Sequence, residues 1–242
     1  MSTASLIRDE VEKNGFATCE AVVSAAEAEE LLAAIKRVNE RPGVRKRIDV
    51  FAVRNLLEES PEIRELARSP AIRHLIEPVL GAECYPVRGI LFDKVPDANW
   101  KVPWHQDVTI AVQNRIEAYG FGPWSVKDDV LHVQPPAAVL EKMLSLRLHL
   151  DPCGEGNGAL RGIPGSHRWG RIAEEKIPSV REASSEHVCV LETGDVLLMR
   201  PLLLHASAAS RAPDHRRVVH LDFAAVQLPA GMGWFSELTS RA

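Results

Sequence analysis

The sequence predicts an α+β, mainly β protein in which N-terminal helices pack on an antiparallel barrel or jelly roll. The first third of the chain is rich in good helix formers, and from Cys84 onward short β-type runs alternate with Gly, Pro and Asn turns. Helices followed by many short strands are typical of a helical layer on an antiparallel sheet or barrel. Because no repeat or long linker divides the chain, we expect one domain over residues 1–242, helical to about residue 82 and β-rich from about 83 to 228.

The expected helices are marked by capping residues and by breakers. Ser24 precedes a run of helix formers over residues 25–36, and Pro42-Gly43 is expected to end that helix. Ser60-Pro61 has the cap and the first-position proline of a second helix. A further helix is expected to end near Leu80-Gly81.

Five runs are predicted to be strands. They are rich in Val, Leu and Ile and are bounded by turn residues, as short strands usually are. The runs are residues 85–92, 145–150, 188–191, 196–199 and 217–223. Residues 119–136 look like a long loop, and long ordered loops in compact domains tend to cover active sites.

Composition limits the classes of partner. The net charge is -4, the pI is about 6.2, and 26% of the residues are charged, so bulk charge favours neither nucleic acid nor a membrane surface. A small molecule is the expected partner, and nothing indicates the oligomeric state. The four cysteines are scattered and are expected to be free thiols in a reducing compartment. The first residues lack the apolar core of a signal peptide, and no stretch reaches the ~18 apolar residues of a membrane span, so a cytoplasmic location is expected.

Two histidines and one aspartate form a candidate metal site. His105 and Asp107 lie in Trp104-His105-Gln106-Asp107, and His205 follows the apolar run Leu202-Leu203-Leu204. On a strand, residues two apart point to the same side, so His105 and Asp107 can hold one ion together. Two imidazoles and one carboxylate are the ligands of a facial iron(II) site, which leaves positions open for oxygen and a cosubstrate. The chain is therefore a candidate oxygenase.

Other interpretations of these residues remain open. A His-x-Asp pair also arises by chance as a surface pair, and a lone His in a Leu run is more often a core residue than a ligand. Burying an imidazole without a partner is unfavourable, however, and a metal is one such partner. His149, His167 and His220 are rival ligands, and His220 with Asp222 ranks second because it repeats the spacing.

Arg216 lies eleven residues after His205, beyond a polar turn. If the chain reverses there, the guanidinium returns beside His205 and can clasp a carboxylate bidentately, with the Ser207 hydroxyl as a second donor. An anionic cosubstrate held in this way would reach the metal with its other end. Arg217 points to the opposite face of the same strand, and the strand pattern alone does not decide which arginine faces the site.

Polar residues near these motifs are candidates for substrate binding. The Gly-rich segment 154–167 permits tight turns and supplies Asn157 and Arg161. Arg88, Lys94 and Arg161 would give the mouth of the site a positive lining suited to an acidic substrate. Lys94 and Asn99, which precede the His-x-Asp pair, complete the set of candidates.

Seven short motifs, taken in order, resemble one protein family. They are Phe92-Asp93-Lys94, Asn99-Trp100, Trp104-His105-Gln106-Asp107, Arg147-Leu148-His149-Leu150-Asp151, Asn157-Gly158-Ala159-Leu160, Pro164-Gly165-Ser166-His167, and His205-Ala206-Ser207 followed by Arg216. From about residue 84 to 227 the chain resembles the phytanoyl-CoA dioxygenase family of iron(II)- and 2-oxoglutarate-dependent oxygenases.

The resemblance implies a double-stranded β-helix, or jelly roll, with N-terminal helices packed on it. It implies that His105, Asp107 and His205 bind iron(II) and that the enzyme uses 2-oxoglutarate and O2 to hydroxylate or otherwise oxidise a small molecule. It assigns the distal carboxylate of 2-oxoglutarate to Arg216 and Ser207, with Gln106 and Trp124 as further cosubstrate contacts. Relatives that replace the aspartate with a small residue are halogenases, so Asp107 favours hydroxylation. Members of this broad family act on acyl-CoA thioesters, ectoine-like amino acids and natural products, and the sequence does not select among them.

Two other classes of function are carried forward. A cupin-like, redox-neutral metal enzyme such as an isomerase would use a similar barrel but would need no Arg216 clasp and no oxygen. A non-enzymatic ligand-binding barrel would need no metal ligands. Succinate formation in the presence of iron separates these classes from a 2-oxoglutarate-dependent oxygenase.

Overall fold

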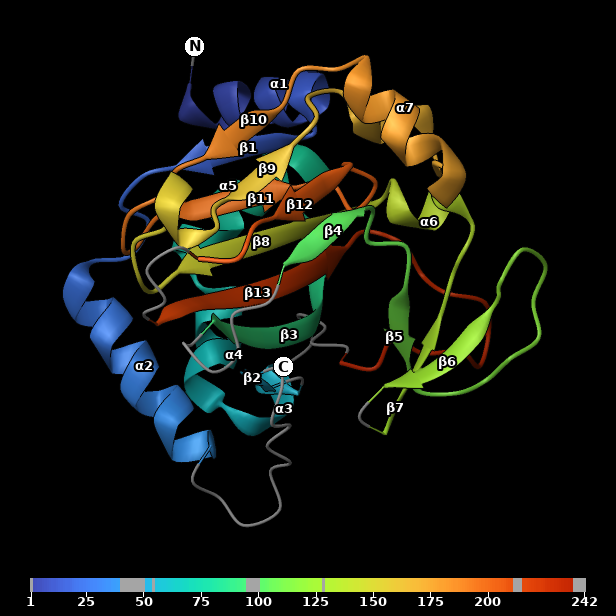
Figure 1. Cartoon of the computed structure of the whole chain (residues 1–242). Coiled ribbons are helices and arrows are strands. Elements are labelled where there is room, and N and C mark those ends of the chain that lie inside the picture. The colour runs from blue at the N-terminus through green and yellow to red at the C-terminus, as the bar shows by residue number, and fades with distance from the viewer. Residues whose placement is uncertain are drawn as a thin grey trace.

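The computed structural model describes residues 2–39, 51–53, 55–94, 101–127, 129–210 and 215–236, with the backbone alone for Asn39, 51–53 and Lys94. Figure 1 shows helices packed on one side of a broad antiparallel sheet, with a smaller sheet on its other side. The α-helices are α1 (Thr3–Asn14), α2 (Ala25–Asn39), α3 (Leu56–Glu59), α4 (Pro61–Arg68), α5 (Pro70–Leu80), α6 (Ala137–Leu140) and α7 (Ile177–Glu182). Single 3-10 turns occupy Glu155–Asn157, Ser166–Trp169 and Glu174–Lys176.

The predicted helix caps are confirmed. Ser24 and Glu27 form a reciprocal capping box at the start of α2, with the Glu27 amide donating to Ser24 Oγ at 3.2 Å and the Ser24 amide donating to Glu27 Oε2 at 2.7 Å. Ser60 Oγ accepts from the Ile63 amide at 3.3 Å, with Pro61 at the first position of α4. The expected stop at residues 42–43 lies outside the described residues.

The large sheet has six antiparallel strands in the order β1-β11-β8-β13-β3-β2. Its strands are β1 (Phe16–Cys19), β2 (Phe51–Val53), β3 (Tyr85–Lys94), β8 (Met143–His149), β11 (Val196–Met199) and β13 (Arg216–Ala224). The expectation of an all-helical first third was wrong, because β1 and β2 add to the two edges of this sheet. Phe16 pairs with Met199, so a strand from near the start of the chain is held by one from near its end.

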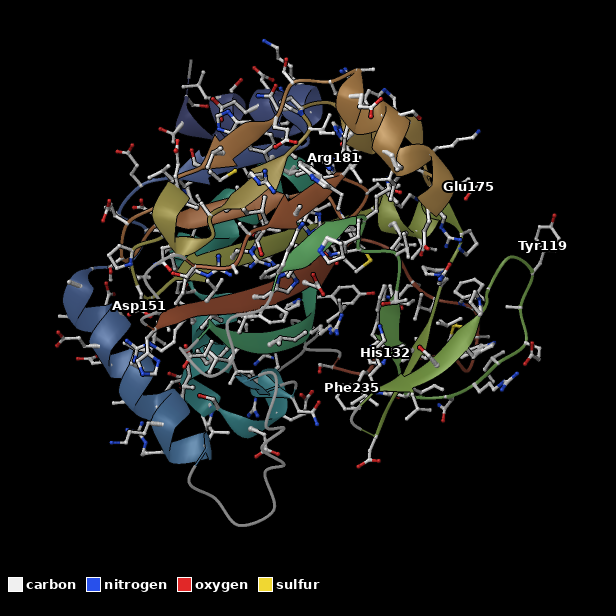
Figure 2. All side chains as sticks on the ribbon, viewed as in Figure 1. Tyr119, His132, Asp151, Glu175, Arg181 and Phe235 are labelled. Carbon is white, nitrogen blue, oxygen red and sulfur yellow. The ribbon has the colours of Figure 1, made fainter. Side chains whose placement is uncertain are left out.

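Two smaller sheets complete the fold. The four-stranded sheet has the order β10-β9-β12-β4, from His187–Cys189, Leu160–Gly162, His205–Ser207 and Val102–His105. The three-stranded sheet has the order β5-β7-β6, from Ile110–Val112, Val130–Val133 and Trp124–Lys127. The long loop expected over 119–136 was therefore wrong in part, because it contains the β6–β7 hairpin; Tyr119, in the loop before β6, extends into solvent (Figure 2).

Strand alternation gives the large sheet two different faces. Leu144, Leu146 and Leu148 of β8 are fully buried in the main hydrophobic core together with residues of the N-terminal helices. Ser145, Arg147 and His149, one residue out of phase, line a pocket on the other face. β13 alternates in the same way, so the sheet that anchors the core also carries the floor of the pocket.

Two expectations of the sequence concern the whole molecule. All four cysteines are described and all are free, as predicted. Among the residues that the structure describes, no helix combines the length and apolarity needed to cross a bilayer.

Candidate metal centre and cosubstrate pocket

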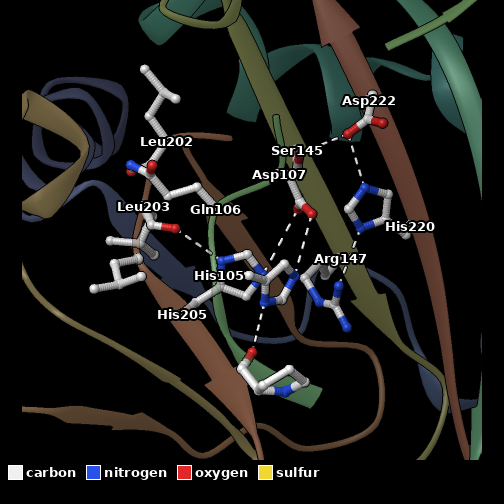
Figure 3. Close-up of polar contacts among 12 residues, drawn as sticks. His105, Gln106, Asp107, Ser145, Arg147, Leu202, Leu203, His205, His220 and Asp222 are labelled. Carbon is white, nitrogen blue, oxygen red and sulfur yellow. Dashed lines mark hydrogen bonds and ion pairs between the residues drawn. The ribbon is translucent and has the colours of Figure 1, made fainter. Parts of the chain in front are cut away.

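Three side chains from two neighbouring strands converge at the candidate metal centre. His105 ends β4 and pairs across the sheet with His205, the first residue of β12. Asp107 follows β4 by two residues, and its amide donates to the Pro201 carbonyl at 2.9 Å. One ligand atom from each of His105, Asp107 and His205 lies within 4.8 Å of the others (Figure 3).

Both imidazoles are oriented by the carbonyl two residues earlier in the chain. His105 Nδ1 lies 2.9 Å from the Pro103 carbonyl, and His205 Nδ1 lies 2.9 Å from the Leu203 carbonyl. A carbonyl only accepts, so Nδ1 carries a proton in each ring, and Nε2 is the nitrogen left to bind a metal. Nε2 of His105 is 3.6 Å from Asp107 Oδ1, and Nε2 of His205 is 3.8 Å from Asp107 Oδ2. Both Nε2 atoms therefore face the carboxylate, as a shared metal site requires.

The charge states of the three groups follow from their environment. Burial disfavours the Asp107 carboxylate, but the His105 hydrogen bond and the charges of His205 and His105 outweigh it and lower the pKa. Burial also disfavours the His105 imidazolium, but the Asp107 hydrogen bond and charge raise its pKa. Burial lowers the pKa of His205 to about 4. The ionised carboxylate and the buried neutral imidazole are forms that bind a divalent cation.

The metal candidates line a cavity of about 380 Å³ between the large and the four-stranded sheets. Arg216 and Ser207 line the same cavity, and both are buried. Arg216 Nη1 donates to the Gly158 carbonyl and lies 3.7 Å from Cys153 Sγ, while its Nε has no partner. The structure thus places the Arg216 guanidinium in the cavity that holds the metal candidates, and within the described residues no carboxylate pairs with it.

Arg217 lies outside the cavity lining. Its Nε and Nη2 donate to the two carboxylate oxygens of Asp151 at 2.8 and 2.6 Å. The strand pattern left open which of the two arginines faces the site. In the structure Arg216 lines the cavity, whereas Arg217 binds Asp151 bidentately outside it.

Gln106 and Trp124, the two further cosubstrate candidates, occupy different surroundings. Gln106 lines the cavity, but its amide group bonds three backbone groups: Nε2 donates to the Gly170 and Leu202 carbonyls at 2.8 and 2.7 Å, and Oε1 accepts from the Ile172 amide at 2.8 Å. Both amide protons are therefore in use. Trp124 is absent from the cavity lining and packs in a second hydrophobic cluster.

The four substrate candidates do not gather at the described cavity. Asn157 donates to the Pro152 carbonyl at 2.9 Å, and Arg161 bonds Glu186 at 3.1 Å while its guanidinium lies over the Trp104 ring; neither lines the cavity. The Lys94 backbone pairs with that of Arg216, and the Lys94 side chain lies outside the part of the chain that the structure describes. Asn99 also lies outside the described residues.

The rival pair His220 and Asp222 is committed to another network. His220 Nε2 lies 2.9 Å from Asp222 Oδ1, and the Ser145 hydroxyl donates to the same oxygen at 2.6 Å (Figure 3). Among the described residues, His105, Asp107 and His205 form the one group of three His, Cys, Asp or Glu side chains that could hold a metal.

Sequence reasoning missed the polar floor of the cavity. Ser145, Arg147 and His149 alternate with Leu144, Leu146 and Leu148 along β8. A strand that places three polar residues in phase within an apolar run predicts a polar face toward a site, and this signal was available in the sequence.

The residues present fit iron(II). Two imidazole nitrogens and one carboxylate from one side of the cavity are a donor set that non-haem iron accepts, and three protein ligands leave positions for a chelating cosubstrate. Arg216 places a positive charge in the same cavity, which suits an anionic ligand.

The fold and the site together define a class, the non-haem iron and 2-oxoglutarate oxygenases. Within that class, the family model for phytanoyl-CoA dioxygenase matches residues 11–218. The chain belongs to the phytanoyl-CoA dioxygenase family.

Named relatives agree with this assignment. The iron/alpha-ketoglutarate-dependent dioxygenase ausO of Aspergillus calidoustus is 31% identical over 101 residues, which are 41% of this chain and 33% of the relative. Ectoine dioxygenase of Bordetella parapertussis is 27% identical over 166 residues, which are 65% of this chain and 47% of the relative. The matches thus span between a third and a half of these relatives.

Solved structures show the same fold. The epimerase SnoN, in complex with Fe3+, alpha ketoglutarate and nogalamycin RO, has a TM-score of 0.71 at 17% identity, with 97% of this chain and 93% of that chain covered. At this identity the likeness concerns the fold.

Proposed function

We propose that this chain is an iron(II)- and 2-oxoglutarate-dependent oxygenase that hydroxylates a small-molecule substrate and releases succinate and carbon dioxide from the cosubstrate. One observation carries the proposal: the metal-binding atoms of His105, Asp107 and His205 converge in the cavity that Arg216 also lines. A redox-neutral metal enzyme has no need of that arginine, and a ligand-binding barrel has no need of the three ligands. We also propose that residues 1–242 form one double-stranded β-helix domain with N-terminal helices.

Each side chain has a defined task in this proposal. His105, Asp107 and His205 hold iron(II), while Arg216 and Ser207 hold the distal carboxylate of 2-oxoglutarate. When bound, iron and 2-oxoglutarate would activate O2, so that one oxygen atom goes to succinate and the other to the substrate. Because Asp107 occupies the position that a small residue takes in halogenating relatives, oxygen transfer is the expected outcome.

Gln106 has a supporting task. One of its backbone bonds fixes the chain between His105 and Asp107 to Leu202, in the segment that precedes His205, and the other two fix it to Gly170 and Ile172. Hydrogen bonds of this kind position ligands without contacting the metal. The earlier expectation of a cosubstrate contact from Gln106, like that from Trp124, stays a prediction.

Succinate formation tests the proposal. Native protein with iron(II), 2-oxoglutarate and oxygen should release succinate, and a true substrate should accelerate its release. The matched control is His205→Ala, which removes one imidazole from a three-ligand site and should abolish turnover. A protein that binds iron but never forms succinate would be a redox-neutral enzyme, and one that binds no iron would be a simple ligand-binding barrel.

A further inference from the structure

The cavity contains a second arginine that neither the metal nor the cosubstrate accounts for. Arg147 lies in the middle of β8 and lines the cavity together with the metal candidates. Its Nη1 is 3.2 Å from His220 Nδ1, on the paired residue of β13. A guanidinium only donates, so Nδ1 accepts, and the proton of His220 lies on Nε2, which faces Asp222. The imidazole therefore orients Arg147 without neutralising it.

Within the described residues, no carboxylate pairs with Arg147. Asp222, the nearest acidic member of this network, is engaged by Ser145 and His220 at 2.6 and 2.9 Å and lies 3.8 Å from Arg88 Nη1. The Arg147 Nε is buried and has no hydrogen-bond partner. Burial and the neighbouring charge of Arg216 lower the pKa of Arg147, as expected for a cation held without an anion.

Unpartnered polar atoms cluster around Arg147. Among the described residues, Nε of Arg147, both ring nitrogens of His149 and Nε of Arg216 are buried and lack a partner. Burial and the charges of Arg147 and Arg216 lower the pKa of His149 to about 3, so this imidazole is neutral and offers one N–H donor. Buried polar groups in native proteins are nearly always paired, so a cluster of exceptions indicates a place where a ligand supplies the partners.

The charges in the cavity indicate two separate anion sites. The net positive charge of iron(II), Asp107 and Arg216 together would neutralise a metal-bound 2-oxoglutarate dianion. Arg88 lies beside Asp222, and Lys127, on β6, is exposed to solvent that screens its charge. Arg147 remains as a cation in a low-dielectric cavity, and such a charge is strongly unfavourable until an anion pairs with it.

We propose that Arg147 anchors a carboxylate of the primary substrate, which is therefore a small carboxylic acid. This inference rests on the proposed function, since it assigns 2-oxoglutarate to Arg216. The cavity of about 380 Å³ is near the lower end of the ~300–1,000 Å³ usual for ligand sites and must hold both molecules. Val102, Val108, Leu140 and Met143 give it an apolar wall, which suits a compact apolar body on the acid.

Binding of matched acids and amides tests the inference. The protein is loaded with iron(II) and 2-oxoglutarate without oxygen, and acetate, butanoate, hexanoate and phenylacetate are each titrated against their primary amides by calorimetry. The visible charge-transfer band, recorded at each point, shows that 2-oxoglutarate stays bound. The variants are Arg147→Gln, Arg147→Lys and Arg217→Gln, the last an arginine on the neighbouring strand that lies outside the cavity.

Native protein and Arg217→Gln should bind at least one acid about tenfold more tightly than its amide, because a charge-assisted pair forms with Arg147. Arg147→Gln should remove the preference while the affinity for 2-oxoglutarate changes less than about twofold, and Arg147→Lys should keep part of it. The inference is overturned if no acid binds in preference to its amide, if the preference survives in Arg147→Gln, or if that variant loses its affinity for 2-oxoglutarate. A native protein without the charge-transfer band would instead refute the proposed function itself.

Discussion

The imidazoles of His105 and His205 are oriented before a metal binds. Each ring donates from Nδ1 to the carbonyl two residues earlier, so rotation of the ring would break a local hydrogen bond. This local bond fixes the tautomer and directs Nε2 toward Asp107. The carboxylate is the one ligand of the three that lies beyond a strand end, and it is held through its backbone at Pro201.

Asp107→Ala should lower iron affinity by at least about a hundredfold and remove most oxidation, because a charged oxygen ligand leaves a three-ligand site. Metal titration and succinate assays measure the two effects. Glu117→Ala, which removes an exposed carboxylate paired with Arg115, is the control. Full iron binding and turnover in Asp107→Ala would show that Asp107 is not the third ligand, and native protein that chlorinates its substrate would contradict the same assignment.

Arg216→Ala should raise the dissociation constant of 2-oxoglutarate about tenfold to a hundredfold while iron stays bound, because a charge-assisted hydrogen bond is worth roughly 1.5–3 kcal/mol. Anaerobic titration of the visible band measures this constant. Arg217→Ala should change it far less, since Arg217 pairs with Asp151. The reverse ranking would mean that the wrong arginine is assigned to the pocket.

The candidate metal ligands could be predicted from the sequence because they lie in short motifs. His105 and Asp107 lie two residues apart, the spacing at which strand side chains point to the same side. His205 and Arg216 lie on strands of different sheets, so their approach in the cavity depends on the fold and not on strand alternation. The role of Gln106 could not be predicted, because its partners Gly170, Leu202 and Ile172 come from distant segments.

At the scale of single elements, the turn before β9 contacts Arg216 in the cavity. The Gly158 carbonyl accepts from Arg216 Nη1, and Gly158 has a φ of +71°. A Cβ at this position would lie 2.4 Å from the Ala208 carbonyl oxygen. The turn therefore needs glycine both for its left-handed backbone and for the close approach of the segment after β12.

Gly158→Ala should weaken 2-oxoglutarate binding and lower the free energy of unfolding by about 1–3 kcal/mol, because the turn must shift and take the Arg216 contact with it. Binding titration and thermal unfolding measure the two effects. Gly156→Ala is the matched control in the same turn, since a Cβ there meets nothing within 4 Å. Equal behaviour of the two variants would show that the turn does not position Arg216.

On the scale of the whole molecule, a buried aspartate joins the N-terminal segment to the turn before β11. Asp195 Oδ1 accepts from the Ala21 amide and Oδ2 from the Glu192 amide, both at 2.8 Å. The first bond holds the segment after β1 against the turn that leads into β11. The general order of helices before strands followed from the sequence, but this pairing joins residues too distant for local patterns to specify.

Asp195→Ala should destabilise the fold by about 1–3 kcal/mol, because two backbone amides lose their acceptor. For a chain of this length that corresponds to a fall in Tm of several degrees, at about 2–4 °C per kcal/mol. Thermal unfolding measures the shift, and Glu192→Ala, at an exposed neighbour, should change Tm little. An unchanged Tm in Asp195→Ala would mean that the N-terminal strand is held by its pairing alone.

β4 lies at the edge of the four-stranded sheet, yet it carries His105 and leads into Asp107. Bound iron would cross-link this edge strand to His205 on β12, which lies inside the sheet. Amide hydrogens of β4 should therefore exchange with solvent much more slowly once metal is added, while those of β8 and β13 change little. Metal loading would then be measurable as slower amide exchange in β4, and bound iron would stabilise the edge strand of this sheet.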